Sequence, residues 1–432
     1  MIRVKKICLV LISFSVLFTQ CLKVPEPEPE LGPELPEVFE IVDQNFLDTL
    51  IGLGYDLNGN RRIDSLEALE IEFLYISSCD ISDLEGIQNF LNLRVLDCTS
   101  NNLSSLNVSY NSILEELYCN DNQLSRLLLS GSNELRWLEC ANNELTTLNI
   151  SGNMLLEYLD CNENSLSSIQ MPDSAVPLIY LDCRNNELTS LNISSCNELM
   201  DLLCYSNRLG SLYLANNTAL VNLQVGSYEL TALDVSHNTA LEYLICSGCS
   251  LSSLDVSKNL DLEFLACNAC GLTALDVSNN TALTNLYCEE NQLSSLDLSN
   301  NTDLLYLSCS YNQLTQLDLS SNPYLRSLYC YRNQLSSLEV SHLHVLTGFG
   351  CSYNQLPSLD VSQNTSLMFL GCAGNQLDHL NLSQNSSLTS LDLRDMPSLK
   401  EVCVWTLPFP PDGFILYDDG SPNLYFTTNC SL

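Results

Sequence analysis

Apolar residues recur with a period of 21 along most of this chain, in the frame LxxLxCxxNxLxxLDVSxNxx. In LxC the apolar positions alternate with a polar one, which is the pattern of a β-strand with one buried face. The cysteine position occurs sixteen times in phase, with intervals of 22 residues only before Cys98 and Cys183. Such self-similarity predicts one array of stacked coils. The position is occupied by Ile76, Cys98, Cys119, Cys140, Cys161, Cys183, Cys204, Val225, Cys246, Cys267, Cys288, Cys309, Cys330, Cys351, Cys372 and Leu393.

The second half of each repeat, LDVSxN, has the same apolar rhythm about ten residues later. We therefore predict a short second strand or extended segment on the opposite side of each coil, and no helix there. Sixteen flattened, right-handed coils with parallel strands about 4.8 Å apart would extend roughly 70 to 80 Å along the stack.

An asparagine three residues after the cysteine position is expected to turn the chain and to bond the backbone of neighbouring coils through its amide. In three copies Cys79, Cys249 or Cys270 takes this place. The asparagines are Asn101, Asn122, Asn143, Asn164, Asn186, Asn207, Asn291, Asn312, Asn333, Asn354 and Asn375.

This frame is the leucine-rich-repeat signature. The 21-residue repeats with a cysteine in a leucine position resemble bacterial surface proteins of the internalin J type, over about residues 68 to 400. The resemblance implies a curved solenoid with a ladder of stacked cysteines, and adhesion at the cell surface. The predicted fold is an α/β-type repeat that is mostly β: a right-handed leucine-rich-repeat solenoid of about 16 coils. Parallel strands would line its concave face, short extended segments its convex face, and a small helical cap its N-terminal end.

The cysteines are expected to belong to the core. Val225 and Leu393 replace the cysteine in two copies, so the position is apolar and buried. A buried thiol behaves as a small hydrophobic group with a raised pKa and little reactivity. A metal site is disfavoured because a row of thiols without histidines does not form a tetrahedron. A redox role for these cysteines is also disfavoured, because a buried thiol is not accessible to an oxidant or a partner thiol.

The first 21 residues read as a lipoprotein-type signal peptide. Basic residues precede an apolar run, 7–18, which is too short to span a bilayer. Phe18-Thr19-Gln20-Cys21 resembles a lipobox, although Phe18 and Gln20 depart from it. Lipidation of Cys21 is expected, with ordinary cleavage and secretion or an uncleaved segment as alternatives. Residues 22–37 are an acidic, Pro-rich linker. These features predict an exported protein, lipid-anchored on the bacterial outer membrane or cell surface, with no other membrane contact.

Residues 38–70 are predicted to be a helical N-terminal cap that contains a calcium-like loop. The stretch DLNGNRRIDSLE resembles an EF-hand or dockerin loop. It departs from that pattern because Arg61 stands where such loops carry a glycine with positive φ. The expected cofactor is one structural calcium ion, and a simple polar turn between two helices is the alternative. The candidate ligands are Asp56, Asn58, Asn60, Arg62 through its carbonyl, Asp64 and Glu67.

The repeats 71–400 are followed by an aromatic-rich segment, 401–432, which departs from the period and is expected to be the C-terminal cap. Cys403 and Cys430 bracket this segment. In an exported protein they can form a disulfide that fixes the cap, and two free thiols are the alternative.

Candidate function lies in the strand positions that face outward, three and one residues before the cysteine position and one after it. Aromatic residues with polar groups suit recognition surfaces, and a row of them over many coils would expose a large apolar stripe. The alternative is that aromatic residues simply favour strands. The predicted binding residues for a protein or glycan are Trp137, Tyr158, Tyr180, Tyr205, Tyr243, Phe264, Tyr287, Tyr306, Tyr329 and Tyr331.

A row of acids precedes the convex apolar residues, for example Asp234, Asp255 and Asp276, each with a serine two residues later. We expect solvation and local hydrogen bonds there, with a cation-binding stripe as the alternative.

The formal net charge of −36 makes nucleic acid and anionic membrane unfavourable partners. No catalytic motif is apparent. The sequence therefore predicts a non-enzymatic cell-surface protein, monomeric, that binds a protein or glycan through its concave face. An envelope scaffold protein with a structural role is the alternative.

Overall fold

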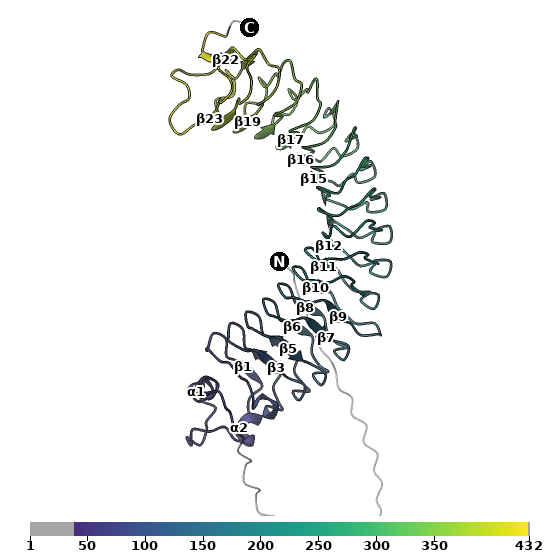
Figure 1. Ribbon diagram of the computed structural model, residues 1–432, viewed down its shortest axis with the longest axis vertical. Coiled ribbons are helices and arrows are strands. Elements are labelled where there is room, and N and C mark those ends of the chain that lie inside the picture. The colour runs from purple at the N-terminus through teal and green to yellow at the C-terminus, as the bar shows by residue number, and fades with distance from the viewer. Residues whose placement is uncertain (1–38, 431–432) are drawn as a thin grey trace, which may run out of the picture.

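Each repeat forms one coil with a three-residue strand, and the strands join into one parallel sheet. The computed structural model describes residues 39–430, and Figure 1 shows the coils stacked into an arc with this sheet on the concave side. Seventeen strands form it in chain order. They are β1 (Phe73–Tyr75), β2 (Val95–Asp97), β4 (Glu116–Tyr118), β6 (Trp137–Glu139), β8 (Tyr158–Asp160), β10 (Tyr180–Asp182), β11 (Asp201–Leu203), β12 (Asn222–Gln224), β13 (Tyr243–Ile245), β14 (Phe264–Ala266), β15 (Asn285–Tyr287), β16 (Tyr306–Ser308), β17 (Ser327–Tyr329), β18 (Gly348–Gly350), β19 (Phe369–Gly371), β21 (Ser390–Asp392) and β23 (Ile415–Tyr417).

The opposite side of the coils carries the extended segments that the half-repeat predicts. In several coils they pair into short parallel sheets, and elsewhere they run extended without assigned strands. The paired strands are β3 (Ser105–Asn107) with β5 (Arg126–Leu128), β7 (Thr147–Asn149) with β9 (Ser168–Gln170), and β20 (His379–Asn381), β22 (Glu401–Cys403) and β24 (Tyr425–Thr427).

The core lies between these two sides and follows the frame directly. Neighbouring strands pair in register, so that Leu286 lies opposite Leu307, and both are essentially inaccessible to solvent. The cysteines of the frame, such as Cys288 and Cys309, are likewise fully buried. Each coil thus adds the same leucine and cysteine positions to one continuous apolar column.

Two rows of asparagine connect the coils where the chain turns. In the first row Asn312 donates from Nδ2 to the carbonyls of Cys288 (2.9 Å) and Cys309 (3.1 Å), and its Oδ1 accepts from the Leu293 N–H (3.0 Å). The residue before it, Tyr311, has a left-handed backbone (φ 54°), which costs a non-glycine residue roughly 1 kcal/mol or more. The asparagine bonds hold this turn in place.

The second row comes from LDVSxN and is completely buried. Asn280 donates from Nδ2 to the carbonyls of Val256 (3.0 Å) and Asn259 (2.8 Å) in the preceding coil. Asn259, Asn301 and Asn322 repeat this arrangement. Both halves of the repeat therefore use the same amide chemistry to join successive coils.

The N-terminal end is capped by short helices, as the sequence predicts. Helix α1 (Gln44–Gly52) is capped at its N-terminus by Asp43, whose side chain accepts from the Phe46 N–H, and it buries Phe46 and Leu50. Helix α2 (Ser65–Leu69) starts with a capping box between Asp64 and Glu67, and the 3₁₀ helix η1 (Ile87–Asn89) lies in the first coil. Among the described residues, no helix has the length and apolarity needed to cross a bilayer. The signal segment with Cys21 and the linker 22–37 lie outside the described residues.

The C-terminal segment continues the solenoid further than the period indicates. After an irregular excursion over 405–414, β23 adds a seventeenth strand to the concave sheet, one more coil than the sixteen copies of the frame. The excursion interrupts the 21-residue spacing, which hides this coil in the sequence. Phe409 packs against Trp405, Phe414 and Phe426 in an aromatic cluster over the end of the core.

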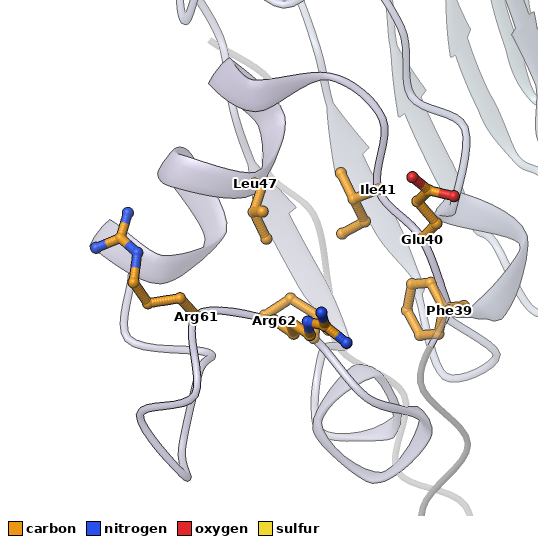
Figure 2. Close-up of a pocket in the computed structure, with 7 residues that line it drawn as sticks. Phe39, Glu40, Ile41, Leu47, Arg61 and Arg62 are labelled. Carbon is orange, nitrogen blue, oxygen red and sulfur yellow. The ribbon is translucent and has the colours of Figure 1, made fainter.

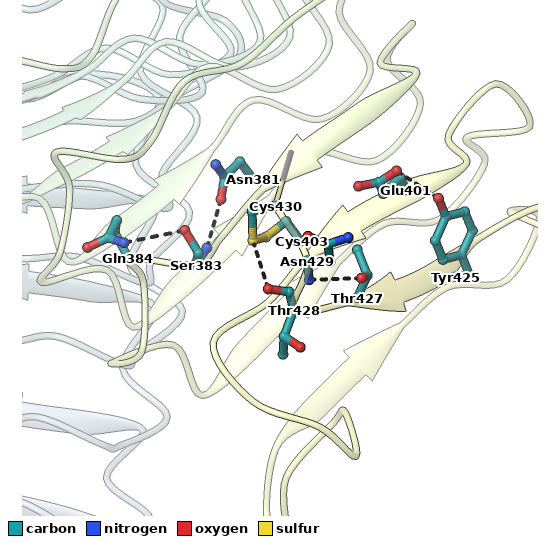
Figure 3. The surroundings of a disulfide bond; sticks show 10 residues. All are labelled: Asn381, Ser383, Gln384, Glu401, Cys403, Tyr425, Thr427, Thr428, Asn429 and Cys430. Carbon is teal, nitrogen blue, oxygen red and sulfur yellow. Dashed lines mark hydrogen bonds between the residues drawn. A yellow bond between two sulfur atoms is a disulfide. The ribbon is translucent and has the colours of Figure 1, made fainter. Parts of the chain in front are cut away.

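Cys403 and Cys430 form a disulfide in this cap, with their Cα atoms 5.5 Å apart (Figure 3). Cys403 belongs to β22, while Cys430 follows β24, so the bond links the last convex strands of the solenoid.

Candidate functional site

The predicted binding residues all lie on the concave sheet or directly after its strands, and all ten are half-buried. Most of them gather into three aromatic groups. These are Trp137, Tyr158 and Tyr180; Tyr243, Phe264 and Tyr287; and Tyr329 with Tyr331 and Phe369. Tyr205 lies instead beneath the Arg184 guanidinium, 5.5 Å from its ring centre. Tyr306 stands outside all three groups.

The first group is a continuous stack. The ring centres of Trp137 and Tyr158 are 3.7 Å apart with planes at 1°, and those of Tyr158 and Tyr180 are 4.4 Å apart with planes at 2°. The in-register pairing of β6, β8 and β10 places the same position directly above itself in the next coil. Ring stacking of this kind contributes about 0.5–1.5 kcal/mol per pair and explains why the rings are only half exposed.

Carboxylates surround this stack. We define the acidic–aromatic section as the concave face of strands β2, β4, β6, β8, β10 and β11. Its three outward rows contain one guanidinium, Arg184, and six carboxylates: Asp97, Glu116, Glu139, Asp160, Asp182 and Asp201. The Trp137 indole N–H donates to Glu139 (2.8 Å), and the Tyr118 hydroxyl donates to Glu116 (2.9 Å), so the acids also orient the rings.

Asp182 is the most buried of these acids. Burial raises its pKa to about 6, and the nearby Asp160 acts in the same direction. Arg184 Nε lies 2.9 Å from Asp182 Oδ2, yet this buried oxygen receives no well-directed hydrogen bond. Burial also raises the pKa of Asp160. The cluster therefore carries more negative charge than its own cation neutralises.

The remainder of the concave face is nearly neutral. We define the neutral section as strands β12 to β19 and β21, whose three outward rows hold only Glu289, Asp392 and Arg394 as charged residues. Its C-terminal part has glycine at Gly348, Gly350 and Gly371, and the Tyr331 ring lies so close to Gly350 that a Cβ there would overlap it. The aromatic group thus rests directly on the backbone of the sheet.

The frame is interrupted near the middle of the arc. Tyr228, Cys249 and Cys270 replace three consecutive asparagines of the first row. Cys270 keeps part of the function, because its Sγ donates to the Cys246 carbonyl (3.1 Å). Where Tyr228 stands, a hollow of about 540 Å³ opens between Tyr205 and Gly248.

The calcium-like loop is closed by its own hydrogen bonds. Asp56 accepts from the N–H groups of Asn60 and Arg61, and Glu67 accepts from those of Asn58 and Asp64. Arg61 has the positive φ (61°) that the resemblance requires there. Within residues 39–430, however, no three or more His, Cys, Asp or Glu side chains gather as a metal-ligand group. Some candidate ligands contact one another across the loop: Asn58 donates from Nδ2 to Asp64 (3.3 Å), and the Asn60 N–H lies 3.0 Å from oxygens of both Asp56 and Asn58.

A hollow of about 420 Å³ lies between this loop, α1 and the segment 39–41 (Figure 2). Arg61 and Arg62 border it on the loop side, and Phe39 and Ile41 on the other. Arg61 also pairs with Asp48 of α1 (3.2 Å). This hollow belongs to the cap and is separate from the concave aromatic groups.

The convex acids form the local hydrogen bonds that the sequence predicts. Asp255 accepts from the Ser257 N–H and Asp276 from the Ser278 N–H, each at 2.9 Å. The N–H and hydroxyl of Ser257 hold the pKa of the exposed Asp255 carboxyl below its usual value, and the hydroxyl and N–H of Ser278 do the same for Asp276. The acid row is therefore part of the turn structure.

Comparisons with solved structures place this arrangement among known folds. The functional domain of InlJ from Listeria monocytogenes, which includes a cysteine ladder, matches with a TM-score of 0.63 and 29% identity, over 79% of this chain and 70% of that one. The chain is a leucine-rich-repeat protein with a cysteine ladder. YopM from Yersinia enterocolitica shares the fold at a TM-score of 0.60 and 21% identity, over 83% and 92% of the two chains. A chain of the Drosophila Toll–Spatzle complex does so at 0.60 and 18%, over 78% and 55%. No protein-family model and no curated protein matches.

In this leucine-rich-repeat protein the cysteine ladder is structural. Cys98 and Cys119 are fully buried, and their thiols donate to backbone carbonyls of the next coil at 3.4 and 3.3 Å. Burial raises the pKa of Cys309 to about 12 and raises the pKa values of Cys98 and Cys119 in the same direction. Reactive thiolates are therefore scarce along the ladder.

Sequence reasoning missed two features of the concave face. It did not single out the glycines of β18 and β19, although glycine at outward strand positions signals a close approach by another group. It also did not separate an acidic from a neutral section, although the residue types in the three outward rows carry that information once the frame is set.

Proposed function

We propose that this chain is an exported recognition protein at the bacterial cell surface that binds a protein or glycan partner through its concave face. The main support for this proposal is the stack of Trp137, Tyr158 and Tyr180 on outward strand positions. The fold needs only the inward leucine and cysteine in these strands. Aromatic residues concentrated at positions that the fold leaves free are typical of binding surfaces.

A strand preference for aromatic residues is a weaker explanation. Positions equivalent to the stack are occupied by Asp201, Asn222 and Ser327 in other coils, so the fold accepts small polar residues there. Half-buried rings with polar edges provide a rigid contact surface for a partner, because they lose little side-chain entropy on binding.

The experiment is a binding screen with the purified full-length chain against glycan arrays and candidate surface proteins. The combined change Trp137→Ala, Tyr158→Ala and Tyr180→Ala should reduce binding of any ligand found by at least about tenfold. The control changes Tyr213→Ala and Tyr324→Ala, at residues 81% and 57% exposed outside the concave face, should leave binding unchanged. Equal binding by all variants would contradict the concave-face proposal.

Surface exposure and anchoring are separate parts of the proposal. Protease added to intact cells should degrade the chain, whereas protection would favour the envelope scaffold. A lipid on Cys21 should appear as incorporation of labelled palmitate that the Cys21→Ala variant loses. Incorporation that persists in this variant would contradict the anchor.

We also propose that the loop 56–67 binds one structural calcium ion. The support is its set of oxygen donors and the left-handed Arg61. Calcium at about 1 mM should raise the melting temperature of the wild-type chain, as linkage requires when only the folded state binds. It should have no effect on Asp56→Ala, and an equal shift in both chains would exclude this loop.

A further inference from the structure

We propose that the acidic–aromatic section binds an extended segment rich in lysine and arginine from a partner protein. This inference rests on the proposed recognition function and specifies its ligand. The two sections of the concave face have the same fold and both carry stacked rings. They differ in charge, and that difference indicates what the first section recognises.

The charge of the section is not balanced locally. Its outward rows hold six carboxylates and one guanidinium, whereas the neutral section holds two carboxylates and one guanidinium over more strands. In the row just before the strands, Arg94 pairs with Glu115 and Arg136 with Glu157, so these cations are already engaged. A cationic partner would find several acids with no neighbouring positive charge.

The buried acids support the same reading. Asp182 is fully buried, and its one neighbouring cation, Arg184, lies 2.9 Å from Oδ2 without a well-directed hydrogen bond. Burial of Asp182 beside Asp160 raises the pKa of both carboxyls. Such carboxylates gain more from an approaching cation than exposed ones, because water screens them less.

The rings add a second attraction for cations. A guanidinium or ammonium is favoured over an aromatic face by about 0.5–2 kcal/mol. The described part of the chain contains five such contacts: Arg184 lies over Tyr205, Arg332 lies 4.5 Å from the Tyr353 ring centre and 5.5 Å from that of Tyr311, and the other two join Arg94 to Phe73 and Arg394 to Tyr417. Trp137 and Tyr180 end the stack, and within residues 39–430 neither packs against a second ring on its other side.

The section also sets the length of its ligand. Six strands about 4.8 Å apart span about 24 Å, and an extended peptide rises about 3.3 Å per residue. A basic segment of about seven residues therefore covers the section. Polyanions are repelled by the same charges, and a neutral sugar would use the rings without the carboxylates.

The test measures binding of fluorescein-labelled peptides to the full-length chain by anisotropy. The probe is a ten-residue peptide of alternating Arg and Ser, and its reference has citrulline, the uncharged analogue, at each Arg position. Wild type should bind the Arg peptide at least about tenfold more tightly, equivalent to about 1.4 kcal/mol. Equal binding of the two peptides would overturn the proposal.

Matched variants locate the site. Glu116→Gln, Asp160→Asn and Asp201→Asn together should weaken the Arg peptide at least about fivefold, and each substitution retains an oxygen acceptor. The convex set Asp234→Asn, Asp255→Asn and Asp276→Asn removes the same three charges and should change binding less than about twofold. If both sets weaken binding equally, the attraction is only the net charge of the chain and the proposal is wrong.

Substitutions of the aromatic rings provide a second, independent test of where the peptide binds. Trp137→Ala with Tyr158→Ala should weaken the Arg peptide, while Tyr243→Ala with Phe264→Ala, a stacked pair in the neutral section with ring centres 4.1 Å apart, should not. The proposal would be overturned if the Tyr243 and Phe264 changes weakened binding of the Arg peptide and the Trp137 and Tyr158 changes did not. If a ligand from the binding screen depends on Trp137 while the Arg peptide fails, the basic-segment inference is wrong and the recognition function stands.

Discussion

The asparagine rows should be the main polar contribution to the stability of the solenoid, and Asn312 allows a sharp test. Replacing Asn312 by alanine removes the donors to the Cys288 and Cys309 carbonyls and the acceptor for the Leu293 N–H. Asn312 is only 8% exposed, so water replaces these bonds poorly. Each buried group left without a partner costs about 1–3 kcal/mol, and we expect a loss of about 3–5 kcal/mol in the free energy of unfolding.

Cysteine, which occurs naturally at this repeat position, should be intermediate in stability between asparagine and alanine. Cys270 occupies the same repeat position two coils before Asn312, and its Sγ donates to the carbonyls of Cys246 (3.1 Å) and Asn268 (3.4 Å) but cannot replace the amide oxygen. Asn312→Cys should therefore lose about half as much as Asn312→Ala. Gln313→Ala, at the exposed neighbouring position, should stay within about 0.5 kcal/mol of wild type.

Two assays read this effect. Denaturant unfolding gives the total loss, and hydrogen exchange at the Leu293 amide reports the local bond, which matters because repeat arrays can open locally. A loss below about 1 kcal/mol for Asn312→Ala, with the Leu293 amide still protected, would refute the reasoning.

Three other outcomes follow from the burial, charge and covalent links described above. Iodoacetamide should alkylate the half-buried Cys79 in the native chain well before Cys309, which should react only after unfolding; equal rates by mass spectrometry would contradict a buried ladder. Asp182 has a folded pKa of about 6, above its ordinary value, so its stabilising contribution is complete below about pH 4 and lost as the pH rises to about 6. Asp182→Asn should therefore gain up to about 3 kcal/mol at pH 7.5, measured by denaturant unfolding, and a clear loss there would be inconsistent with this sign. Cys430→Ser opens a link of 27 residues and should make the segment 405–430 sensitive to limited proteolysis, with a local cost of about 3–4 kcal/mol; unchanged cleavage of this segment would argue against the disulfide as its restraint.

The period of 21 was sufficient to predict the coil, the buried cysteine and the side of each strand. It works because inward and outward positions alternate strictly in a strand, so Trp137 and Tyr158 could be assigned to the outer face from spacing alone. The convex hydrogen bonds, such as Ser257 to Asp255, were predictable because they link residues two apart in the chain.

Other features depend on contacts that the spacing does not contain. The coil with β23 follows an irregular excursion, so its register is fixed by pairing with β21 rather than by the period. The grouping of Tyr329 with Tyr331 and Phe369 depends on ring orientation above Gly350. The burial of Asp182 Oδ2 without a directed hydrogen bond depends on the packing of neighbouring coils.

The central claim is that partners contact the concave face in its acidic–aromatic section. Site-specific photo-crosslinking tests it most directly, with a photoreactive phenylalanine analogue placed at Tyr158 on the stack or at Tyr213 on the convex side, in cells that export the full-length chain. The account predicts a discrete crosslinked partner from position 158 that Glu116→Gln, Asp160→Asn and Asp201→Asn together abolish, and none from position 213. The same partner captured equally from both positions would contradict it.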